Sequence, residues 1–124
     1  MANYYGTTRT NYFAVKDANA FKDFLKDIDC EIVERDGKFA ILGGSEGEIN
    51  FCPDEVDLLD TIHEHLQDGE VLVIQHVGAE KMRYLCAWSI AIHSSGEREY
   101  LGISDIYSVA QELWPDASIT EATY

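Results

Sequence analysis

The chain has 124 residues and carries 23 acidic against nine basic side chains, which gives a formal net charge of −14 at pH 7. This length predicts a single domain, residues 1–124, whose core is large enough to fold without a metal or a disulfide. The charge argues against direct binding to nucleic acid or to an anionic membrane, and it favours contact with basic surfaces.

The cysteines are three in number, Cys30, Cys52 and Cys86, and they lie in apolar or strand-like segments. An odd number in such surroundings predicts reduced, buried thiols rather than a disulfide framework. The sequence has no apolar run of about 18 residues and no leader with a basic start and an apolar centre. We therefore expect a cytoplasmic protein that does not cross a membrane.

The first elements predicted along the chain are a strand over residues 10–15 and a helix that ends near residue 27. The many Tyr and Thr residues of the segment 3–13 also favour a strand. Asp17 stands where a residue that caps the helix is expected. The predicted buried face of this helix consists of residues at helical spacing: Phe21, Phe24, Leu25 and Ile28.

A hairpin is predicted next, with strands over residues 30–35 and 38–42. The pair Asp36-Gly37 joins them, and both residues tolerate the positive φ angles of a tight turn. A short strand is predicted over residues 48–52. Pro53 fits the first turn of a second helix that ends near Leu66. The predicted apolar face of this second helix is Val56, Leu59, Ile62 and Leu66.

Residues 71–77 and 84–92 are nearly continuous apolar runs. Such runs are typical of strands that are covered on both faces, so we expect them at the centre of the sheet. A strand over residues 99–103 and a third helix capped by Ser104 complete the pattern. The third helix carries Ile106, Val109, Ala110 and Leu113 on one face. The predicted fold is α+β, a mainly antiparallel sheet with three helices in the order β-α-β-β-β-α-β-β-β-α.

The acidic residues are concentrated in the middle of the chain, where residues 39–80 contain ten Asp or Glu and no Lys or Arg. Within the second predicted helix, carboxylates recur every three or four residues and would share one face. A row of carboxylates on a rigid element can imitate a phosphate backbone, although it can also be an ordinary solvated face of an acidic protein. The predicted partner-binding residues are Glu46, Glu48, Asp54, Asp57, Asp60, Glu64, Asp68 and Glu70.

The sequence contains no recognisable catalytic or metal-binding pattern. His63 and His65 are two residues apart, whereas two metal ligands from one helix need a spacing of four. Cys52 precedes a predicted helix start, but Asp54 and Glu55 oppose the formation of a thiolate there. We predict no cofactor, no metal and no enzymatic activity. A small enzyme that depends on a Cys or a His remains an alternative.

Residues 3–13 (NYYGTTRTNYF) and 78–84 (GAEKMRY) resemble a group of small acidic proteins that are encoded on bacterial plasmids, conjugative elements and prophages. The resemblance implies the setting of a mobile element and assigns no functional residue. Small acidic proteins of such elements are often inhibitors of host defence, similar to anti-restriction and anti-CRISPR proteins that occupy the DNA site of a nuclease.

The leading hypothesis is an inhibitor from a phage or mobile element, located in the bacterial cytoplasm, that acts as a nucleic-acid mimic. Its partner would be a basic nucleic-acid-binding protein or nuclease complex, whose DNA- or RNA-binding groove it would block. An immunity or antitoxin-type protein that neutralises a basic toxin is the alternative. The sequence leaves the oligomeric state open between a monomer and a homodimer.

Overall fold

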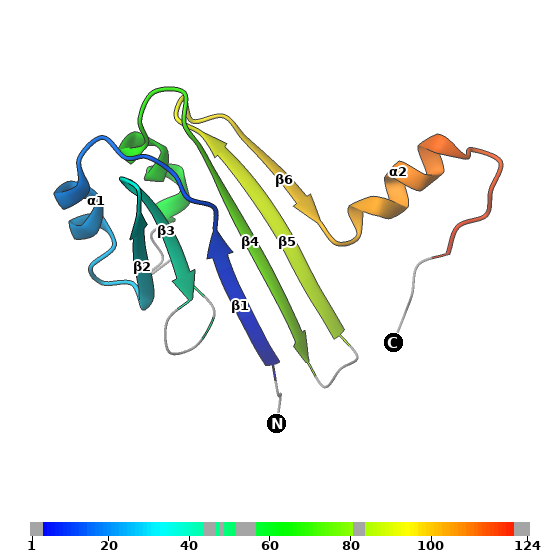
Figure 1. The fold of residues 1–124 in the computed structure, drawn as a ribbon. Coiled ribbons are helices and arrows are strands. Elements are labelled where there is room, and N and C mark those ends of the chain that lie inside the picture. The colour runs from blue at the N-terminus through cyan, green and yellow to red at the C-terminus, as the bar shows by residue number, and fades with distance from the viewer. Residues whose placement is uncertain (1–3, 44–46, 48, 52–56, 81–83, 121–124) are drawn as a thin grey trace.

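The computed structural model describes residues 4–43, 47, 49–51, 57–80 and 84–120 (Figure 1). Six strands form one antiparallel sheet in the order β2-β3-β1-β4-β5-β6, so the prediction of an α+β fold with a mainly antiparallel sheet is confirmed. The strands are β1 (Tyr4–Thr10), β2 (Cys30–Arg35), β3 (Lys38–Gly43), β4 (Val71–Glu80), β5 (Tyr84–His93) and β6 (Arg98–Gly102). The described helices are α1 (Ala18–Phe24), α2 (Asp105–Leu113) and the 3-10 helices η2 (Leu58–Asp60) and η3 (Ile62–His65). No helix in these described ranges has the length and apolar character needed to cross a membrane.

The hairpin of β2 and β3 forms as predicted. Asp36 and Gly37 have φ angles of 52° and 78°, which are the left-handed values that this pair tolerates. The two strands pair from Cys30 opposite Gly43 to Arg35 opposite Lys38. The local turn chemistry therefore sets the register of this edge of the sheet.

Helix α1 begins at the predicted cap. The Asp17 carboxylate accepts hydrogen bonds from the backbone N–H groups of Asn19, at 3.0 Å, and Ala20, at 3.2 Å. These two N–H groups have no carbonyl partner within the helix, so the carboxylate satisfies them. The helix ends at Phe24, three residues earlier than predicted.

Replacing Asp17 with Ala is expected to lower the free energy of unfolding by about 1 kcal/mol, because two helical N–H groups lose their acceptor. Urea unfolding followed by circular dichroism measures the change. Asp17→Asn is the matched control, since the amide oxygen can still cap the helix, and it should lose much less. Equal losses in both variants would contradict the capping role.

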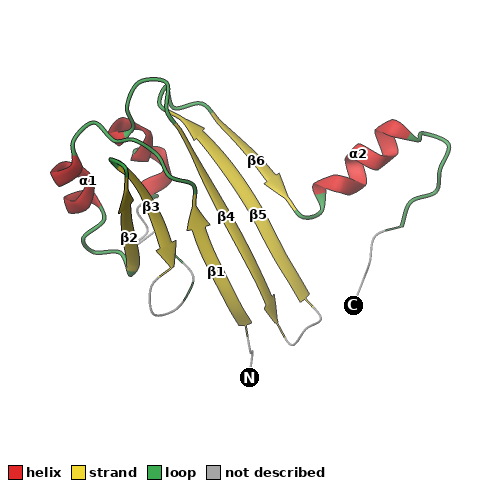
Figure 2. Cartoon of the chain, viewed as in Figure 1, coloured by secondary structure: helices red, strands yellow, loops and turns green. Residues whose placement is uncertain are grey.

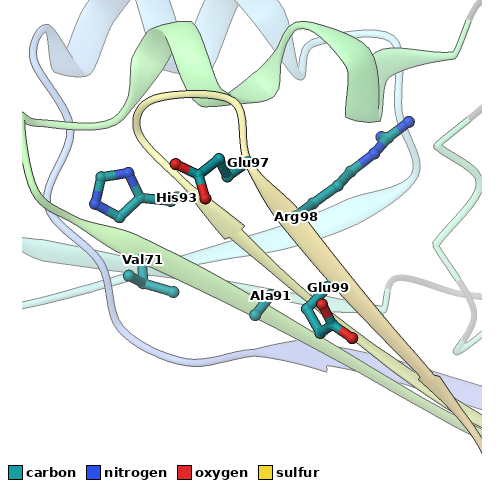
Figure 3. A pocket seen from close by; sticks show the side chains of 6 residues that line it. All are labelled: Val71, Ala91, His93, Glu97, Arg98 and Glu99. Carbon is teal, nitrogen blue, oxygen red and sulfur yellow. The ribbon is translucent and has the colours of Figure 1, made fainter.

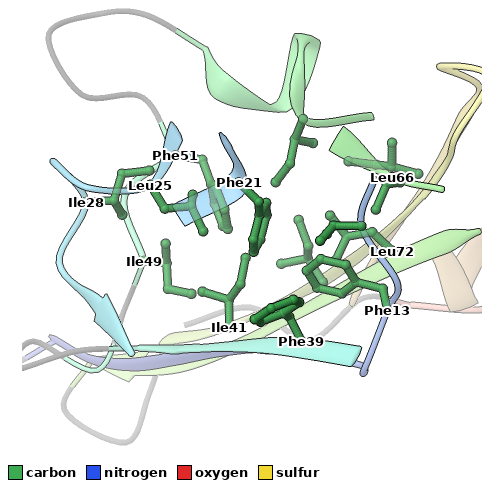
Figure 4. Packing of buried hydrophobic residues seen from close by; sticks show 14 of the residues in the cluster. Phe13, Phe21, Leu25, Ile28, Phe39, Ile41, Ile49, Phe51, Leu66 and Leu72 are labelled. Carbon is green, nitrogen blue, oxygen red and sulfur yellow. The ribbon is translucent and has the colours of Figure 1, made fainter. Parts of the chain in front are cut away.

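The core lies between one face of the sheet and the layer that contains α1, η2 and η3 (Figures 2 and 4). Phe21 of α1 is fully buried and packs edge-on against Phe13, with ring centroids 5.5 Å apart. It also lies beside the ring of Phe39, at 5.8 Å. The other members of this buried cluster come from several elements: Val15, Leu25, Ile28, Ile41, Ile49, Phe51, Ile62, Leu66, Leu72, Ile74, Ile90 and Ile92.

The prediction of a second helix over residues 53–66 is wrong for residues 57–66, the part that the structure describes. Asp57 has extended backbone angles, and the N–H of Leu58 donates to the carbonyl of Phe51 at 2.8 Å, so no helix passes through this point. The side chain of Asp57 then caps η2, and a break at Thr61 separates η2 from η3. Asp and Thr side chains compete for backbone hydrogen bonds in this way, which favours caps over helix interiors. The described part of the chain consequently has two α-helices, where three were predicted.

A strand was also predicted over residues 48–52. The structure describes residues 49–51 of this segment, and they do not form a strand. Ile49 and Phe51 are nevertheless buried in the core. The N–H of Ile49 donates to the Thr8 hydroxyl at 3.2 Å, so a side chain replaces the strand partner that this amide would otherwise need. The observed order is therefore β-α-β-β, two 3-10 helices, and then β-β-β-α.

Strands β4 and β5 lie inside the sheet, as predicted, but they are not covered on both faces. Alternate residues of β4, including Leu72 and Ile74, are buried against the helical layer. Val71 and Val77 point to the opposite face and are exposed. The helical layer also stops short of the C-terminal end of β6, because α2 extends away from the sheet (Figure 1). Part of the sheet is thus left without a described helix over it.

Candidate functional site

One end of the sheet gathers acidic side chains from three separate segments. We define the acidic end by five of them: Asp60, Glu64, Asp68, Glu70 and Glu97. Asp60 and Glu64 come from η2 and η3, Asp68 and Glu70 from the turn before β4, and Glu97 from the turn between β5 and β6. All but the half-buried Glu70 are exposed.

Backbone contacts hold these segments together. The N–H of Ser94 donates to the carbonyl of Glu70 at 3.0 Å, and the N–H of Gly69 donates to the Ser94 hydroxyl at 2.9 Å. Gly96 approaches the ring of His63 so closely that an added Cβ would lie 3.4 Å from Nε2. The turn before β4 and the turn between β5 and β6 therefore form one continuous surface with η3.

Two of the predicted binding residues have structural roles. The Asp57 carboxylate accepts a hydrogen bond from the N–H of Leu59 at 3.0 Å, and the residue is half-buried. Asp60 pairs with the Arg98 guanidinium at 3.0 Å. An exposed pair of this kind adds little stability, but it satisfies the Asp60 carboxylate. These two acids are therefore poorer candidates for a partner contact than the sequence suggested.

Glu64, Asp68 and Glu97 are the carboxylates of the acidic end that face solvent without a cation. The described part of the chain contains two ion pairs, Lys26 with Asp23 and Arg98 with Asp60, and neither involves these three residues. Figure 3 shows Glu97 on the same side of the turn as His93, while the neighbouring Arg98 points away. The acidic end thus has five carboxylates against one guanidinium.

Glu97 is the residue of the acidic end that sequence reasoning missed. It lies 27 positions after Glu70 in a segment with basic neighbours, so spacing along the chain does not connect the two. The pairing of β4 with β5, from Val71 opposite His93, brings the turns together. Of the other predicted binding residues, Glu46, Glu48 and Asp54 lie outside the described part of the chain.

The histidines near the acidic end have partners of other kinds. The His65 ring lies against the Phe24 ring, with centroids 4.4 Å apart. Nδ1 of His93 lies 2.9 Å from the Ser95 hydroxyl. Within the described ranges, no three His, Cys, Asp or Glu side chains are grouped in a way that could hold a metal ion.

The described cysteines differ in their surroundings. Burial, and to a smaller extent the charge of Asp29, raises the pKa of the Cys30 thiol, so this thiol is a poor nucleophile. Cys86 is exposed on β5, so its predicted burial is wrong. The alternation of β5 places Cys86 on the face of Trp88, where the helical layer does not reach. Cys52 lies outside the described residues.

Comparison with known proteins identifies no relative. The chain matches no family model, no curated protein and no solved structure.

Proposed function

We propose that the protein is a binding protein whose acidic end docks on the basic, nucleic-acid-binding surface of another protein. The observation that carries this proposal is that the turns carrying Asp68 and Glu97 are hydrogen-bonded together beside η3, which carries Glu64, and that these three exposed carboxylates form no ion pair among the described residues. Carboxylates fixed on a folded surface can take the place of phosphates against Lys and Arg side chains.

The net charge of −14 would speed the encounter with a basic partner, because opposite fields raise association rates at low ionic strength. The resemblance to small acidic proteins of mobile elements narrows the proposed partner class. We propose a restriction nuclease or a CRISPR effector complex of a bacterial host, with the protein acting as an inhibitor that excludes DNA or RNA. Catalysis by the protein itself is not needed for this role.

The test begins with capture of partners by the tagged protein at about 0.1 M and about 0.5 M salt, conditions that screen exposed charges to different extents. Each capture is repeated with added DNA, which competes for a nucleic-acid-binding surface. A nucleic-acid-binding partner that is lost on adding salt or DNA supports the proposal. A partner that resists both contradicts it and favours a toxin–immunity pair.

Charge reversal at Glu64 and Asp68 is expected to weaken binding to the captured partner at least tenfold, since each contact is a charge-assisted one. The matched control is Glu31→Lys with Glu34→Lys, which makes the same change in net charge at exposed positions of β2, the strand at the other edge of the sheet. That control should change affinity less than threefold. Titration calorimetry at fixed salt measures both variants.

Equal weakening by the two double variants would show that only the total charge matters and would overturn the proposed surface. Asp60 is left out of the design because its substitution would also free Arg98. Circular dichroism should show that both variants keep the native fold, since all four side chains are exposed.

A further inference from the structure

The C-terminal helix α2 is amphipathic but leaves its apolar side in solvent. Ile106 and Leu113 are each 63% exposed, and Trp114 is 61% exposed. Val109 lies on the same side, since the four positions recur at helical spacing. Among the described elements, α2 has at most sparse contacts with any other (Figure 1). A free helix of nine residues is too short to be stable by itself in water, where about 12–15 residues are marginal.

The face of the sheet next to α2 is also exposed to solvent. A groove on the face that carries the helical layer is lined by Cys86, Trp88, Tyr100 and Gly102, with Ser104 and Asp105 at one end. Trp88 stacks between His76 and Tyr100, with centroid distances of 5.4 Å and 6.5 Å. This aromatic row continues the buried row of Ile74 and Ile90, but nothing in the described chain covers it. The groove therefore presents an apolar surface on which a helix could pack, but no described helix packs on it.

The turn before α2 directs the helix away from the groove of its own chain. Ile103 donates its N–H to the carbonyl of Ala87 at 2.8 Å, which holds the end of β6 against β5. The Asp105 carboxylate accepts a hydrogen bond from the N–H of Gly102. The connection between β6 and α2 is two residues long and is fixed at both ends. In this arrangement α2 extends away from the sheet of its own chain (Figure 1).

We propose that the groove of one chain receives α2 of a second copy, so that two chains exchange their C-terminal helices in a closed symmetric dimer. Exchange of an identical element is a common route to such dimers, and each contact is then made twice. In the dimer, α2 extends the helical layer over the uncovered part of the partner's sheet.

The exposed apolar area is large enough for this interface. Six apolar residues of α2 and of the groove side of its junction with β6 are exposed: Tyr100, Ile103, Ile106, Val109, Leu113 and Trp114. An aromatic side chain offers roughly 150–250 Å² and an aliphatic one somewhat less, so these residues expose on the order of 600–700 Å². A typical monomer has no apolar patch above about 300–600 Å². A stable interface takes about 800 Å² from each partner, polar atoms included, and in homodimers about 65% of that area is apolar. The exposed apolar area of each copy meets that requirement.

Sedimentation of the full chain over about 1–200 μM, concentrations that bracket a micromolar Kd, is expected to show a species of twice the 14.0 kDa chain mass. The variant Ile106→Asp with Leu113→Asp should be monomeric over the same range, with its Kd raised at least 100-fold. Ser108→Asp is the matched control, because it adds a charge on the opposite side of α2, and it should remain dimeric. A wild-type monomer at every concentration would overturn the proposal, as would a dimer of the double variant.

Mixing two variants distinguishes exchange from any other dimer. Tyr100→Asp damages the groove, and the α2 double variant damages the helix, so each should be monomeric alone. In a mixed pair, the intact α2 of the first chain meets the intact groove of the second, and one of the two contacts returns. We expect heterodimers on mixing that neither chain forms alone. If mixing restores no association, α2 does not dock in the groove of a second copy.

Discussion

Replacing Phe21 with Ala is expected to lower the free energy of unfolding by about 3–5 kcal/mol, which is the usual cost of removing a buried phenylalanine. Phe21 is fully buried and lies where α1 meets the rest of the core. Its ring contacts Phe13 edge-on and lies beside Phe39 and His65. The cavity left by its removal would be lined on all sides by residues that other contacts hold in place, so the site could collapse only partly.

Chemical unfolding of the two variants Phe21→Ala and Phe24→Ala measures this effect within one helix. Phe24 is only partly buried and packs mainly on the His65 ring, so its removal should cost well under half as much. The same substitution on the same helix keeps the change in helix propensity constant. Similar losses in the two variants would mean that α1 does not anchor the core through Phe21.

The features that the sequence predicted well are those that neighbouring residues determine. The Asp36-Gly37 turn and the Asp17 cap each depend on contacts within three residues, and both form as expected. The apolar spacing of Phe21, Leu25 and Ile28 likewise identified the buried side of α1. In each case the side chain and the backbone group that it satisfies are close in sequence, so no knowledge of the tertiary fold was needed.

The prediction of a second helix failed because hydrogen bonds that apolar spacing does not reveal replaced the helical ones. The N–H of Leu58 bonds to the carbonyl of Phe51, and Asp57 caps the short η2 that follows. The apolar residues Ile62 and Leu66 are still fully buried, as the pattern required. Periodicity therefore identified which side chains enter the core but not the backbone conformation that brings them there.

The candidate site was predicted only in part for a related reason. Glu64 and Asp68 were expected to bind a partner through a shared helix face, and the structure instead brings them together with Glu97 by sheet pairing. Asp60 was expected to contact a partner, yet Arg98 of β6 pairs with it. Both differences arise from residues almost 30 or more positions away, which charge counting along the chain cannot connect.

The acidic end and the proposed dimer contact lie at opposite ends of β6. Arg98 begins the strand at the acidic end, and Gly102 ends it at the groove that is proposed to receive α2. A dimer formed through α2 would therefore leave both acidic ends free. Two such ends on one particle would bind a partner with two basic sites more tightly than a monomer could. The charge-reversal and α2 variants can be combined to separate these effects.

Replacing Thr8 with Val is expected to lower the free energy of unfolding by about 1–3 kcal/mol, because the buried N–H of Ile49 loses its acceptor. Thr8 on β1 is 1% exposed. Its hydroxyl oxygen accepts a hydrogen bond from the N–H of Ile49 and lies 2.9 Å from Nδ1 of His76. Val has nearly the same shape, so the loss reports on hydrogen bonding rather than on a cavity.

Thr7→Val is the matched control for this substitution. Thr7 is the neighbouring residue on β1 and is exposed on the opposite face of the sheet, so its change should stay within about 0.5 kcal/mol. Thr8→Ser should recover most of the loss, since it restores the hydroxyl. Denaturant unfolding of the three variants gives the comparison. If Thr8→Val is no worse than Thr7→Val, the bond from the Ile49 amide to the Thr8 hydroxyl adds no stability, and the segment that replaces the predicted fourth strand is held by its apolar residues alone.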